Sequence, residues 1–435
     1  MADRRPSVAQ RDERCSELRA VAAVGLAAAL LATACGDEAA SVAAADAERI
    51  ELPATRAAEA SDAISDFGWD LYRALAVDEA NVVFSPHSIG VALAMTRVGA
   101  GGETAAELDA VLGVESIDTY EESINALDLA FAASARTVEL SDGTTADVEL
   151  DSANALWAQD GFRFEDAFLT ALAESHGAGV HLVDYAGENE AARLEINSWV
   201  ADRTSDRIDE LILPGVLSAL TRLVLTNAVY FRAPWEHPFE PEATNDGIFT
   251  RLDGAQVTVE LMATSETFRY GRVGETQAIE LPYAGGELSM LLLVPDEGTF
   301  GAVSSTMDRQ QLETIVESLA PAQVDLALPR FEFTTHAGLV PVLRSLGVSL
   351  AFDPDLADFS AMTTEGDLYV SDVVHEAFIA VDEAGTEAAA ATAVVMDLNA
   401  APGDTVALTV DRPFLLLLRH GDTNGVLFVG HVVDP

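Results

Sequence analysis

Residues 381–397 constrain the fold of this chain more than any other stretch. They begin as a strand would, pass one glycine at Gly385, and continue as a run of very small side chains. From Thr386 onward every second residue is uncharged, and these residues form one set: Thr386, Ala388, Ala390, Thr392, Val394 and Met396. The acids beyond the glycine, Glu387 and Asp397, fall in the other set. Because alternate side chains of a strand lie on opposite faces, this stretch can enter the middle of a sheet without burying a charge.

A helix is the alternative structure for the same residues. Alanine has the highest intrinsic helix propensity, and Thr386 is of a type that caps helices. The residues that follow favour a loop between strands instead. Residues 399–404 are rich in turn-forming types, and residues 406–410, 414–418 and 426–430 are apolar runs of strand length. The stretch is therefore predicted to join two strands close to the C-terminus.

The charge of the chain excludes several classes of partner. With 72 acidic and 24 basic residues the formal net charge is −48, and every basic residue is an arginine. Such a surface repels nucleic acid, heparin-like polyanions and anionic membrane surfaces. Hydrophobic residues make up 49% of the 435 residues, which is enough for a large core.

The N-terminus has the pattern of an export signal. Several arginines precede an apolar run at residues 20–34, which is short for a membrane-spanning helix. The run ends in a sequence similar to a bacterial lipobox, so we expect residues 1–35 to be a signal peptide with lipidation at Cys35. Ordinary secretion and a plain membrane anchor are the alternatives. The acidic, Ala-rich residues 36–58 are typical of a tether. The predicted location is a membrane-anchored lipoprotein facing the periplasm or the cell exterior, or a secreted protein.

Residues 59–435 are predicted to form one domain. Helical periodicity is clear in residues 60–76, 88–98 and 105–112, whereas short apolar strands dominate after residue 223. A chain with helices first and strands later is typical of an α+β fold, here with a large, mostly antiparallel sheet.

Five segments of this domain resemble the serpin family, in the family's order. Their motifs include Phe84-Ser85-Pro86, Thr226-Asn227-Ala228, Leu328-Pro329-Arg330-Phe331 and Asp411-Arg412-Pro413-Phe414, and the segments are residues 81–104, 225–235, 281–296, 328–348 and 374–435. Together they cover nearly the whole domain. The resemblance implies the serpin fold, in which helices pack on a large central sheet beside smaller sheets. It also implies an exposed reactive-centre loop at about residues 383–404.

The resemblance implies two groups of functional residues. The hinge, where the loop enters the sheet, matches Glu383, Gly385, Thr386, Ala388, Ala389, Ala390 and Ala391. The shutter, a polar cluster where the sheet opens, matches Ser85, Ser88, Asn227 and His375. Hydroxyl, amide and imidazole groups suit this role because their hydrogen bonds can be exchanged as two strands part. For His375 taken alone, a histidine satisfied within the core is the alternative.

Two positions depart from the family pattern. Glu376 follows the shutter histidine, where many members have lysine. Ala263 follows Met262, where members often carry a basic partner for the hinge glutamate. The second departure puts the usual salt bridge of Glu383 in doubt. One exposed ion pair is worth little, so its loss would leave the function intact while making the loop easier to insert.

The function implied by the resemblance is suicide inhibition of a serine protease. The protease attacks the loop and forms an acyl-enzyme, and the cut loop then inserts into the sheet with the protease attached. Counting from Glu383 places the reactive bond at Asn399–Ala400. A shift of one residue either way would place it at Leu398–Asn399 or at Ala400–Ala401.

The residues around the reactive bond indicate the class of target protease. No arginine or lysine lies in residues 386–410, which argues against trypsin-like enzymes. A cut at Leu398–Asn399 suits chymotrypsin- or subtilisin-like enzymes, and a cut at Ala400–Ala401 suits elastase-like ones, whereas asparagine before the cut bond is unusual. An Asn-cleaving cysteine protease is a further alternative.

Other classes of function remain as alternatives. A non-inhibitory serpin, used as a binding or chaperone-like protein, would share the fold. An enzyme is disfavoured because the chain has neither G-x-S-x-G nor H-E-x-x-H. We expect no metal and no cofactor, since the eight histidines are scattered and Cys35 is the one cysteine left after processing. We expect a monomer that reaches a membrane only through its N-terminal lipid.

Overall fold

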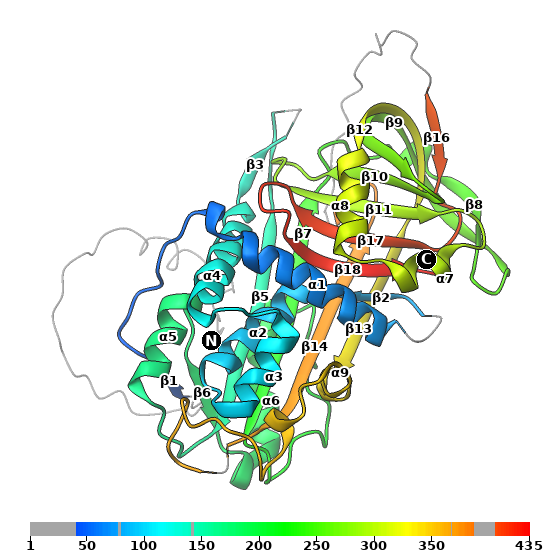
Figure 1. The fold of residues 1–435 in the computed structure, drawn as a ribbon. Coiled ribbons are helices and arrows are strands. Elements are labelled where there is room, and N and C mark those ends of the chain that lie inside the picture. The colour runs from blue at the N-terminus through cyan, green and yellow to red at the C-terminus, as the bar shows by residue number, and fades with distance from the viewer. Residues whose placement is uncertain (1–40, 77–79, 141–142, 367, 387–404) are drawn as a thin grey trace, which may run out of the picture. The chain divides into compact units, whose positions relative to one another are not determined.

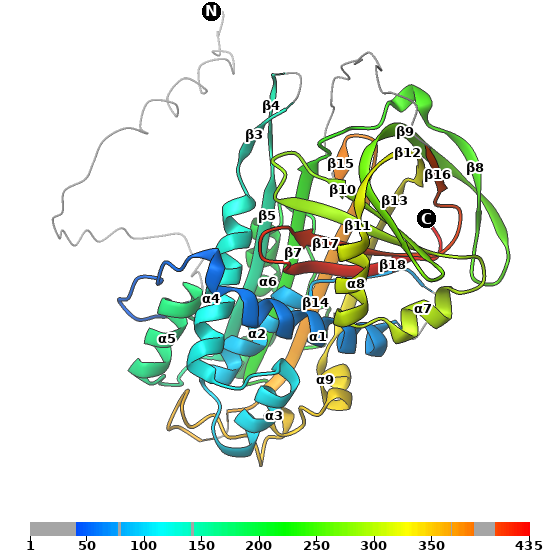
Figure 2. The same ribbon diagram turned by 45° about the horizontal axis from the view of Figure 1, so that its top comes forward.

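The computed structural model describes residues 41–76, 80–140, 143–366, 368–386 and 405–435. Across these residues the chain forms two large sheets and a small hairpin, with helices packed against the sheets (Figure 1). Figure 2 shows the same elements with the top of Figure 1 turned toward the viewer. This mixture of helices and large sheets is the α+β class predicted from the sequence.

The helices come mostly from the first half of the chain. Those predicted at residues 60–76, 88–98 and 105–112 are confirmed as the first three in chain order. The helices are α1 (Ala58–Leu75), α2 (Pro86–Val98), α3 (Gly102–Leu112), α4 (Ile117–Ser134), α5 (Asp166–His176), α6 (Tyr185–Arg203), α7 (Phe300–Thr306), α8 (Arg309–Ser318) and α9 (Val340–Leu346). Short 3-10 turns lie at Ala54–Arg56, Pro241–Ala243 and Leu350–Phe352.

The main sheet has seven strands and carries the candidate site. Its order is β1 (Ser41–Ala43), β6 (Val180–Val183), β5 (Glu149–Gln159), β7 (Leu223–Pro234), β15 (Gly385–Thr386), β14 (Val370–Val381) and β13 (Phe331–Gly338). The pairs β5–β6 and β7–β14 are parallel, and the other pairs are antiparallel. The sheet is therefore mostly antiparallel, as predicted, with one parallel pair at its centre.

The second sheet lies beside the main sheet and has nine strands. Along its main path the order is β16 (Val406–Thr409), β12 (Ala320–Pro329), β9 (Gln256–Val273), β10 (Thr276–Pro282), β11 (Leu288–Pro295), β17 (Phe414–His420), β18 (Val426–Val432) and β2 (Val82–Phe84). Strand β8 (Asn245–Thr250) pairs with β9 outside this path, and β3 (Thr137–Glu139) with β4 (Thr145–Asp147) forms the separate hairpin. The runs predicted at residues 406–410, 414–418 and 426–430 all form strands of this sheet.

Both faces of β7 are buried, which makes it a central strand. One face belongs to the large core that also contains α1 to α5 and the second sheet, and Leu225 and Val229 lie there. The other face belongs to a smaller core beneath α6, where Val224 and Ala228 pack near Ile196. A new neighbour of β7 in the sheet would therefore have both of its faces inside the protein over much of its length.

The predicted tether differs from the structure over the part that the structure describes. Residues 41–58 lie against the domain: Ser41–Ala43 adds an edge strand to β6, and Ile50 N–H donates to the Glu174 carbonyl at 2.8 Å. Arg49 Nη2 also pairs with Asp128 Oδ2 at 2.7 Å. The edge of β6 offers unpaired backbone groups, and Asp128 offers a half-buried negative charge. The segment therefore binds to the domain although its composition is that of a loop. The folded domain thus begins near Ser41 rather than at residue 59.

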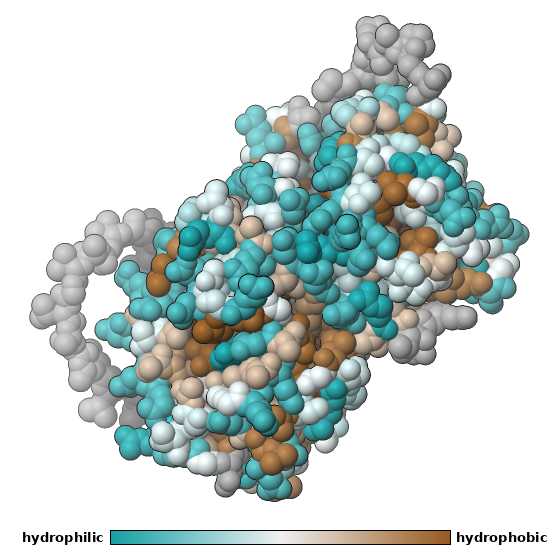
Figure 3. All heavy atoms as spheres, viewed as in Figure 1, coloured by the Kyte–Doolittle hydropathy of each residue, from teal (hydrophilic) through white to brown (hydrophobic). Residues whose placement is uncertain are grey.

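The surface agrees with the charge of the chain. Figure 3 shows one face covered mainly by hydrophilic side chains, with apolar areas scattered between them. Within the part of the chain that the structure describes, no helix is long and apolar enough to cross a membrane.

Candidate functional site

Strand β15 enters the main sheet between β7 and β14. At the lower end of the sheet β7 and β14 pair directly in parallel, with Asn227 opposite His375, and this pairing ends at Val229 and Ala377. At the upper end Gly385 and Thr386 lie between the two strands. Thr386 pairs with Ala233 of β7 and with Val381 of β14, antiparallel to both. The sheet is thus already parted at one end, and the first residues of the predicted loop occupy the gap.

Gly385 is required by how closely the backbones approach. A Cβ atom on this residue would lie 2.1 Å from the carbonyl oxygen of Ala233, well inside van der Waals contact. Any larger residue would push β15 away from β7. The glycine therefore fixes the place where the chain turns into the sheet.

Aromatic side chains hold the residues on both sides of Gly385. The Trp235 indole Nε1–H donates to the Asp382 carbonyl at 3.0 Å, and the Trp235 backbone N–H donates to the Ala384 carbonyl at 2.9 Å. The Tyr283 ring stacks on Trp235 with ring centroids 4.5 Å apart. Its hydroxyl lies 2.5 Å from the Thr386 hydroxyl, and Thr386 is only 1% exposed. These contacts bury the start of the loop in an ordered position.

The hinge glutamate has a basic partner, contrary to the expectation drawn from Ala263. Arg330 Nε lies 2.9 Å from both carboxylate oxygens of Glu383, and Nη2 lies 2.6 Å from Oε1. The Thr244 hydroxyl donates to the same carboxylate. The doubt about this salt bridge was wrong because the partner comes from the turn between β12 and β13, within Leu328-Pro329-Arg330-Phe331, and not from the strand that holds Met262.

The charge of Glu383 is stabilised in this position. Its side chain is only 9% exposed, and burial alone raises the pKa of a carboxyl group. Hydrogen bonds from Arg330 and Thr244 outweigh the burial and hold the pKa of Glu383 below its ordinary value. The hinge is therefore anchored by an ionised carboxylate at neutral pH.

The four predicted shutter residues form one hydrogen-bonded cluster between β7, β14 and the start of α2. The Ser85 N–H donates to His375 Nε2 at 3.3 Å, so Nδ1 carries the proton and donates to Asn227 Oδ1. The Asn227 amide then donates to the Ser88 hydroxyl at 2.7 Å. Burial lowers the pKa of His375 to about 3, so the ring is neutral under all ordinary conditions.

Two further residues of this cluster, Asn154 and Ser152, were not predicted from the sequence. Asn154 of β5 accepts from the Ser88 hydroxyl and from the Asn227 amide, both at 2.6 Å. The Ser152 hydroxyl lies 3.4 Å from that of Ser88. A polar pair within a strand of small residues was the signal that could have found them. The cluster therefore links three neighbouring strands of the main sheet.

Several predicted residues lie outside the described part of the chain. They are the four hinge alanines Ala388, Ala389, Ala390 and Ala391, the reactive-bond candidates Leu398, Asn399, Ala400 and Ala401, and Cys35. Their roles stay predictions.

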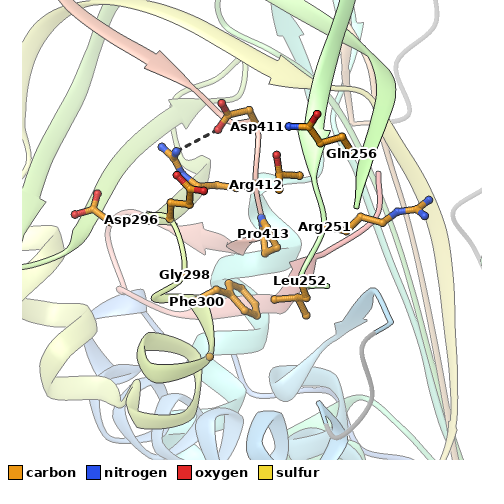
Figure 4. Close-up of a pocket in the computed structure, with 12 residues that line it drawn as sticks. Arg251, Leu252, Gln256, Asp296, Gly298, Phe300, Asp411, Arg412 and Pro413 are labelled. Atoms are coloured by element: carbon orange, nitrogen blue, oxygen red, sulfur yellow. Dashed lines mark ion pairs between the residues drawn. The ribbon is translucent and has the colours of Figure 1, made fainter. Parts of the chain in front are cut away.

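One surface cleft lies apart from the hinge and the shutter. It has a volume of about 320 Å³ and lies between the β8–β9 turn, the start of α7 and the residues that lead into β17 (Figure 4). Its two arginines are already paired, Arg412 with Asp411 and Arg251 with Asp434. Among the described residues no group of His, Cys, Asp and Glu could hold a metal ion. The cleft offers no catalytic arrangement.

Comparison with known proteins gives a consistent result. Residues 62–435 match the profile of the serpin (serine protease inhibitor) family. An uncharacterized serpin-like protein of Thermococcus kodakarensis is 37% identical, covering 86% of this chain and 85% of its own length. A leukocyte elastase inhibitor of Xenopus tropicalis is 32% identical over 86% of this chain and 99% of its own. The crystal structure of the native thermophilic serpin tengpin superposes with a TM-score of 0.79 at 27% identity, covering 91% of this chain and all of that one.

Proposed function

Because the chain belongs to the serpin (serine protease inhibitor) family, which is not a family of enzymes and includes a relative named leukocyte elastase inhibitor, we propose that it traps proteases as a suicide substrate. The target protease cuts the reactive-centre loop at Asn399–Ala400 or a neighbouring bond and stays attached as an acyl-enzyme. The cut loop then adds to the main sheet as a full strand between β7 and β14. The attached protease is carried along and distorted before water can release it.

The observation that carries this proposal is the position of β15. Its two residues already form antiparallel pairs with β7 and β14, which is the arrangement that a fully inserted strand needs. Below β15 only one parallel pair of strands must separate. Insertion would replace it with two antiparallel pairs, adding backbone hydrogen bonds and burying small apolar side chains. This gain is the driving force that the mechanism requires.

The present register of the strands also suits insertion. If the β15 register continues, each later loop residue meets the next earlier residue of β7 and of β14. Thr392 then comes to lie between Asn227 and His375, which are opposite each other now. Neither strand needs to slip along the other to accept the new one. A threonine hydroxyl at that position can take over the hydrogen bonds of the shutter as it opens.

The uncharged loop residues, every second one from Thr386 onward, suit the apolar interior next to the gap between β7 and β14. A small apolar cavity there is lined by Phe231, Tyr283, Met290, Phe378, Ile379 and Thr386. In the continued register Ala388 pairs with Phe231 and Ala390 with Val229, two positions that face the large core. Small side chains enter such a space without forcing the second sheet to move.

The length of β7 limits where the reactive bond can be. The strand has 12 residues, from Leu223 to Pro234, and in the continued register these pair with residues 385–396. If the cut bond lies beyond residue 396, the inserted loop can pair with the whole length of β7 before the attached protease reaches the far end of the sheet. This supports the bond at Asn399–Ala400, or at its neighbours Leu398–Asn399 and Ala400–Ala401.

The target is proposed to be a serine protease of the chymotrypsin, subtilisin or elastase type. The apolar and small residues at the predicted bond carry this choice, and a relative named leukocyte elastase inhibitor agrees with it. A cysteine protease that cleaves after asparagine is the second candidate. The inhibitor is proposed to act as a monomer, exported and held to a membrane by lipid on Cys35 or secreted.

Loop cleavage followed by thermal unfolding tests the insertion step. The protein is nicked within residues 387–404 by a small amount of a zinc metalloprotease, which attacks with a metal-bound water and forms no acyl-enzyme that could be trapped. The unfolding temperature of the nicked protein is then compared with that of the intact protein. Insertion predicts a rise of tens of degrees, because the added strand is buried at the centre of the sheet. An unchanged unfolding temperature would leave a serpin fold that is used for binding instead.

A further inference from the structure

A cavity at the edge of the main sheet lies next to the shutter. Strand β6 pairs with β5 only from Leu156 to Gln159, whereas β7 pairs with β5 from Glu149 onward. In the described part of the chain, no strand pairs with the upper half of β5 on its outer side. Helices α2 and α6, the end of α5 and the segment that contains Val42 and Arg49 enclose a space there of about 400 Å³. Its volume is within the range of pockets that bind small ligands.

One wall of the cavity carries hydrogen-bond donors that belong to the shutter. Asn154 Oδ1 accepts from Ser88 and Asn227, but the Asn154 amide Nδ2 has no hydrogen-bond partner among the described residues. Ser152, two residues earlier on the same face of β5, is exposed, and its hydroxyl lies 3.4 Å from that of Ser88. Both groups can donate to an oxygen atom of a ligand.

Two arginines bring positive charge to the cavity. The guanidinium carbon of Arg203 lies 4.0 Å from the centre of the Trp199 ring, and no carboxylate of the described residues pairs with Arg203. Arg49 is already paired, because its Nη2 lies 2.7 Å from Asp128 Oδ2. Arg203 thus remains available to an anion from solution, although acidic residues outnumber basic ones by 72 to 24.

The other titratable groups at the cavity limit the charge of a ligand. Asp128 is the one acidic side chain among the described residues that line it. Its Oδ1 lies 3.0 Å from His87 Nε2, and its Oδ2 is held by Arg49. The His181 ring stacks on Trp157, and burial lowers the pKa of His181 to about 4, so that this ring is neutral at pH 7. A singly charged anion therefore suits the cavity, whereas further negative charge would be repelled by Asp128.

The rest of the lining is apolar and aromatic. Val91 and Met95 lie one turn apart on the same side of α2, and both line the cavity together with Ala155 of β5. The Trp199 ring meets the His181 ring edge-on, with ring centroids 5.2 Å apart. Such a lining favours a ligand with an apolar body.

We propose that this cavity binds a small organic carboxylate, with its oxygens at Arg203 and the Asn154 amide and its apolar body against α2. A guanidinium and an amide both donate, so together they match the two oxygens of one carboxylate. A neutral ligand would leave Arg203 without a counter-charge. An inorganic anion would leave the apolar part of the cavity unfilled.

The bound carboxylate should slow insertion of the loop, a consequence that rests on the proposed function. Helix α6 lies across the place of insertion, because Ile196 shares one small core with Val224 of β7 and Val374 of β14. A strand that enters between β7 and β14 must therefore shift α6. A ligand held by Arg203 of α6 and Asn154 of β5 ties this helix to the sheet and opposes the shift.

Calorimetric titration of the purified protein tests the site. Benzoate is the probe, and benzamide is the matched ligand of the same shape without the charge. Benzoate is expected to bind at one site, and benzamide about tenfold more weakly. Arg203→Gln removes the cation, and Asn154→Asp replaces the amide donor with a carboxylate of the same shape, so each should weaken benzoate binding about tenfold. Arg272→Gln is the control, because it breaks an exposed ion pair of the second sheet, and it should bind benzoate as the parent does.

Three results would refute the site. They are equal binding of benzoate and benzamide, unchanged benzoate binding by Arg203→Gln, and no heat of binding by the parent at about 10 mM benzoate. Because Arg203 is exposed, its substitution leaves the core intact and carries the test even if Asn154→Asp does not fold.

The effect on insertion is measured separately. Loss of inhibitory activity at 37 °C should be about threefold slower with saturating benzoate in the parent, and unchanged by benzoate in Arg203→Gln. If benzoate binds as assigned but leaves the rate in the parent unchanged, the site stands and its effect on insertion is refuted. If the parent inhibits no protease, the proposed function fails, while the binding result is unaffected.

Discussion

Arg330 holds the Glu383 carboxylate with two of its guanidinium nitrogens, at 2.6 to 2.9 Å. The arginine comes from the turn after β12 and the glutamate from the segment between β14 and β15, so the contact ties the loop entrance to the second sheet. Charge-assisted bonds of this bidentate kind are among the stronger ones in proteins. The contact holds the loop at the point from which insertion would start.

Removing this contact should make the uncut protein convert to the inserted form more readily. Because Arg330 is 38% exposed, the contact is worth only about 1–2 kcal/mol after allowance for solvent. For Glu383→Gln we expect inhibitory activity to be lost about tenfold faster during incubation at 37 °C. The measurement is residual activity against time, with heat resistance of the inactive product as a second readout. Arg309→Gln, which removes exposed ion pairs to Asp66 and Glu313, is the control and should have no effect.

The same contact should depend on pH in a defined direction. The pKa of Glu383 is lowered in the folded protein from an ordinary value of 4.5. A carboxyl group of this kind stabilises the structure above its ordinary pKa and loses that effect as the pH falls through the lowered value. The kinetic advantage of the parent over Glu383→Gln should therefore be complete at pH 6 to 7 and shrink below pH 4.5. An advantage that stays constant down to pH 3 would contradict the assignment.

Thr386→Arg should turn the inhibitor into a substrate. Thr386 is buried against Tyr283, and no acidic side chain lines the small apolar cavity beside it, so a guanidinium group there would lack a counter-charge. Burying an unpaired charge costs several kcal/mol, which is enough to slow insertion far below the rate of deacylation. We expect the number of inhibitor molecules consumed per inhibited protease to rise more than tenfold. Thr386→Ser keeps the hydroxyl and should behave as the parent. A fully active Thr386→Arg variant would show that this position is not buried during inhibition.

His375 should make the protein less stable in mild acid. Its folded pKa is about 3, against an ordinary 6.5, because burial disfavours the charged ring. Between these values the unfolded chain binds one more proton, so the free energy of unfolding falls by up to about 1.4 kcal/mol per pH unit as the pH drops. His375→Asn should lose this slope, although it also breaks the shutter cluster and lowers stability at pH 7 by about 1–3 kcal/mol.

A second histidine gives the opposite sign and serves as the control. The bond from His336 to Glu376 raises the pKa of His336. Its stabilisation is therefore present below pH 6.5 and lost as the pH rises through the raised value. In urea unfolding from pH 4 to 8, His336→Asn should lose stability mainly at the acid end. If both variants shifted the slope in the same direction, the neutral state assigned to His375 would be wrong.

The sequence predicted the elements of this fold better than the contacts between them. Helices α1 and α3 follow from periodicity, because each buries one face and exposes the other, whereas α2 is buried nearly all round. Gly385 stood out because it is the one glycine in a run of strand-like residues, and the structure shows the close approach to Ala233 that needs it. The family resemblance named Ser85, Asn227 and His375, and the structure brings all three together. These features could be predicted because each depends on residue types and spacing within a single short segment of the sequence.

Contacts between distant segments were harder to predict. The partner of Glu383 was sought next to Met262, whereas Arg330 supplies the charge from a neighbouring turn. Asn154 joins the shutter only because β5 pairs with β7 in one particular register. Residues 41–58 have the composition of a tether, yet the open edge of β6 and the acid Asp128 bind them. In each case the deciding interaction joins parts of the chain that sequence spacing does not relate.

The most direct test of the account is to look for the trapped protease itself. The purified protein is incubated with subtilisin, chymotrypsin, elastase and trypsin, then analysed by denaturing gel and by mass spectrometry of the released C-terminal peptide. We predict a covalent complex that survives detergent with at least one of the first three enzymes and not with trypsin. The peptide should begin at Asn399, Ala400 or Ala401. Cleavage in the loop without any complex, and without a rise in thermal stability, would contradict the inhibitory mechanism.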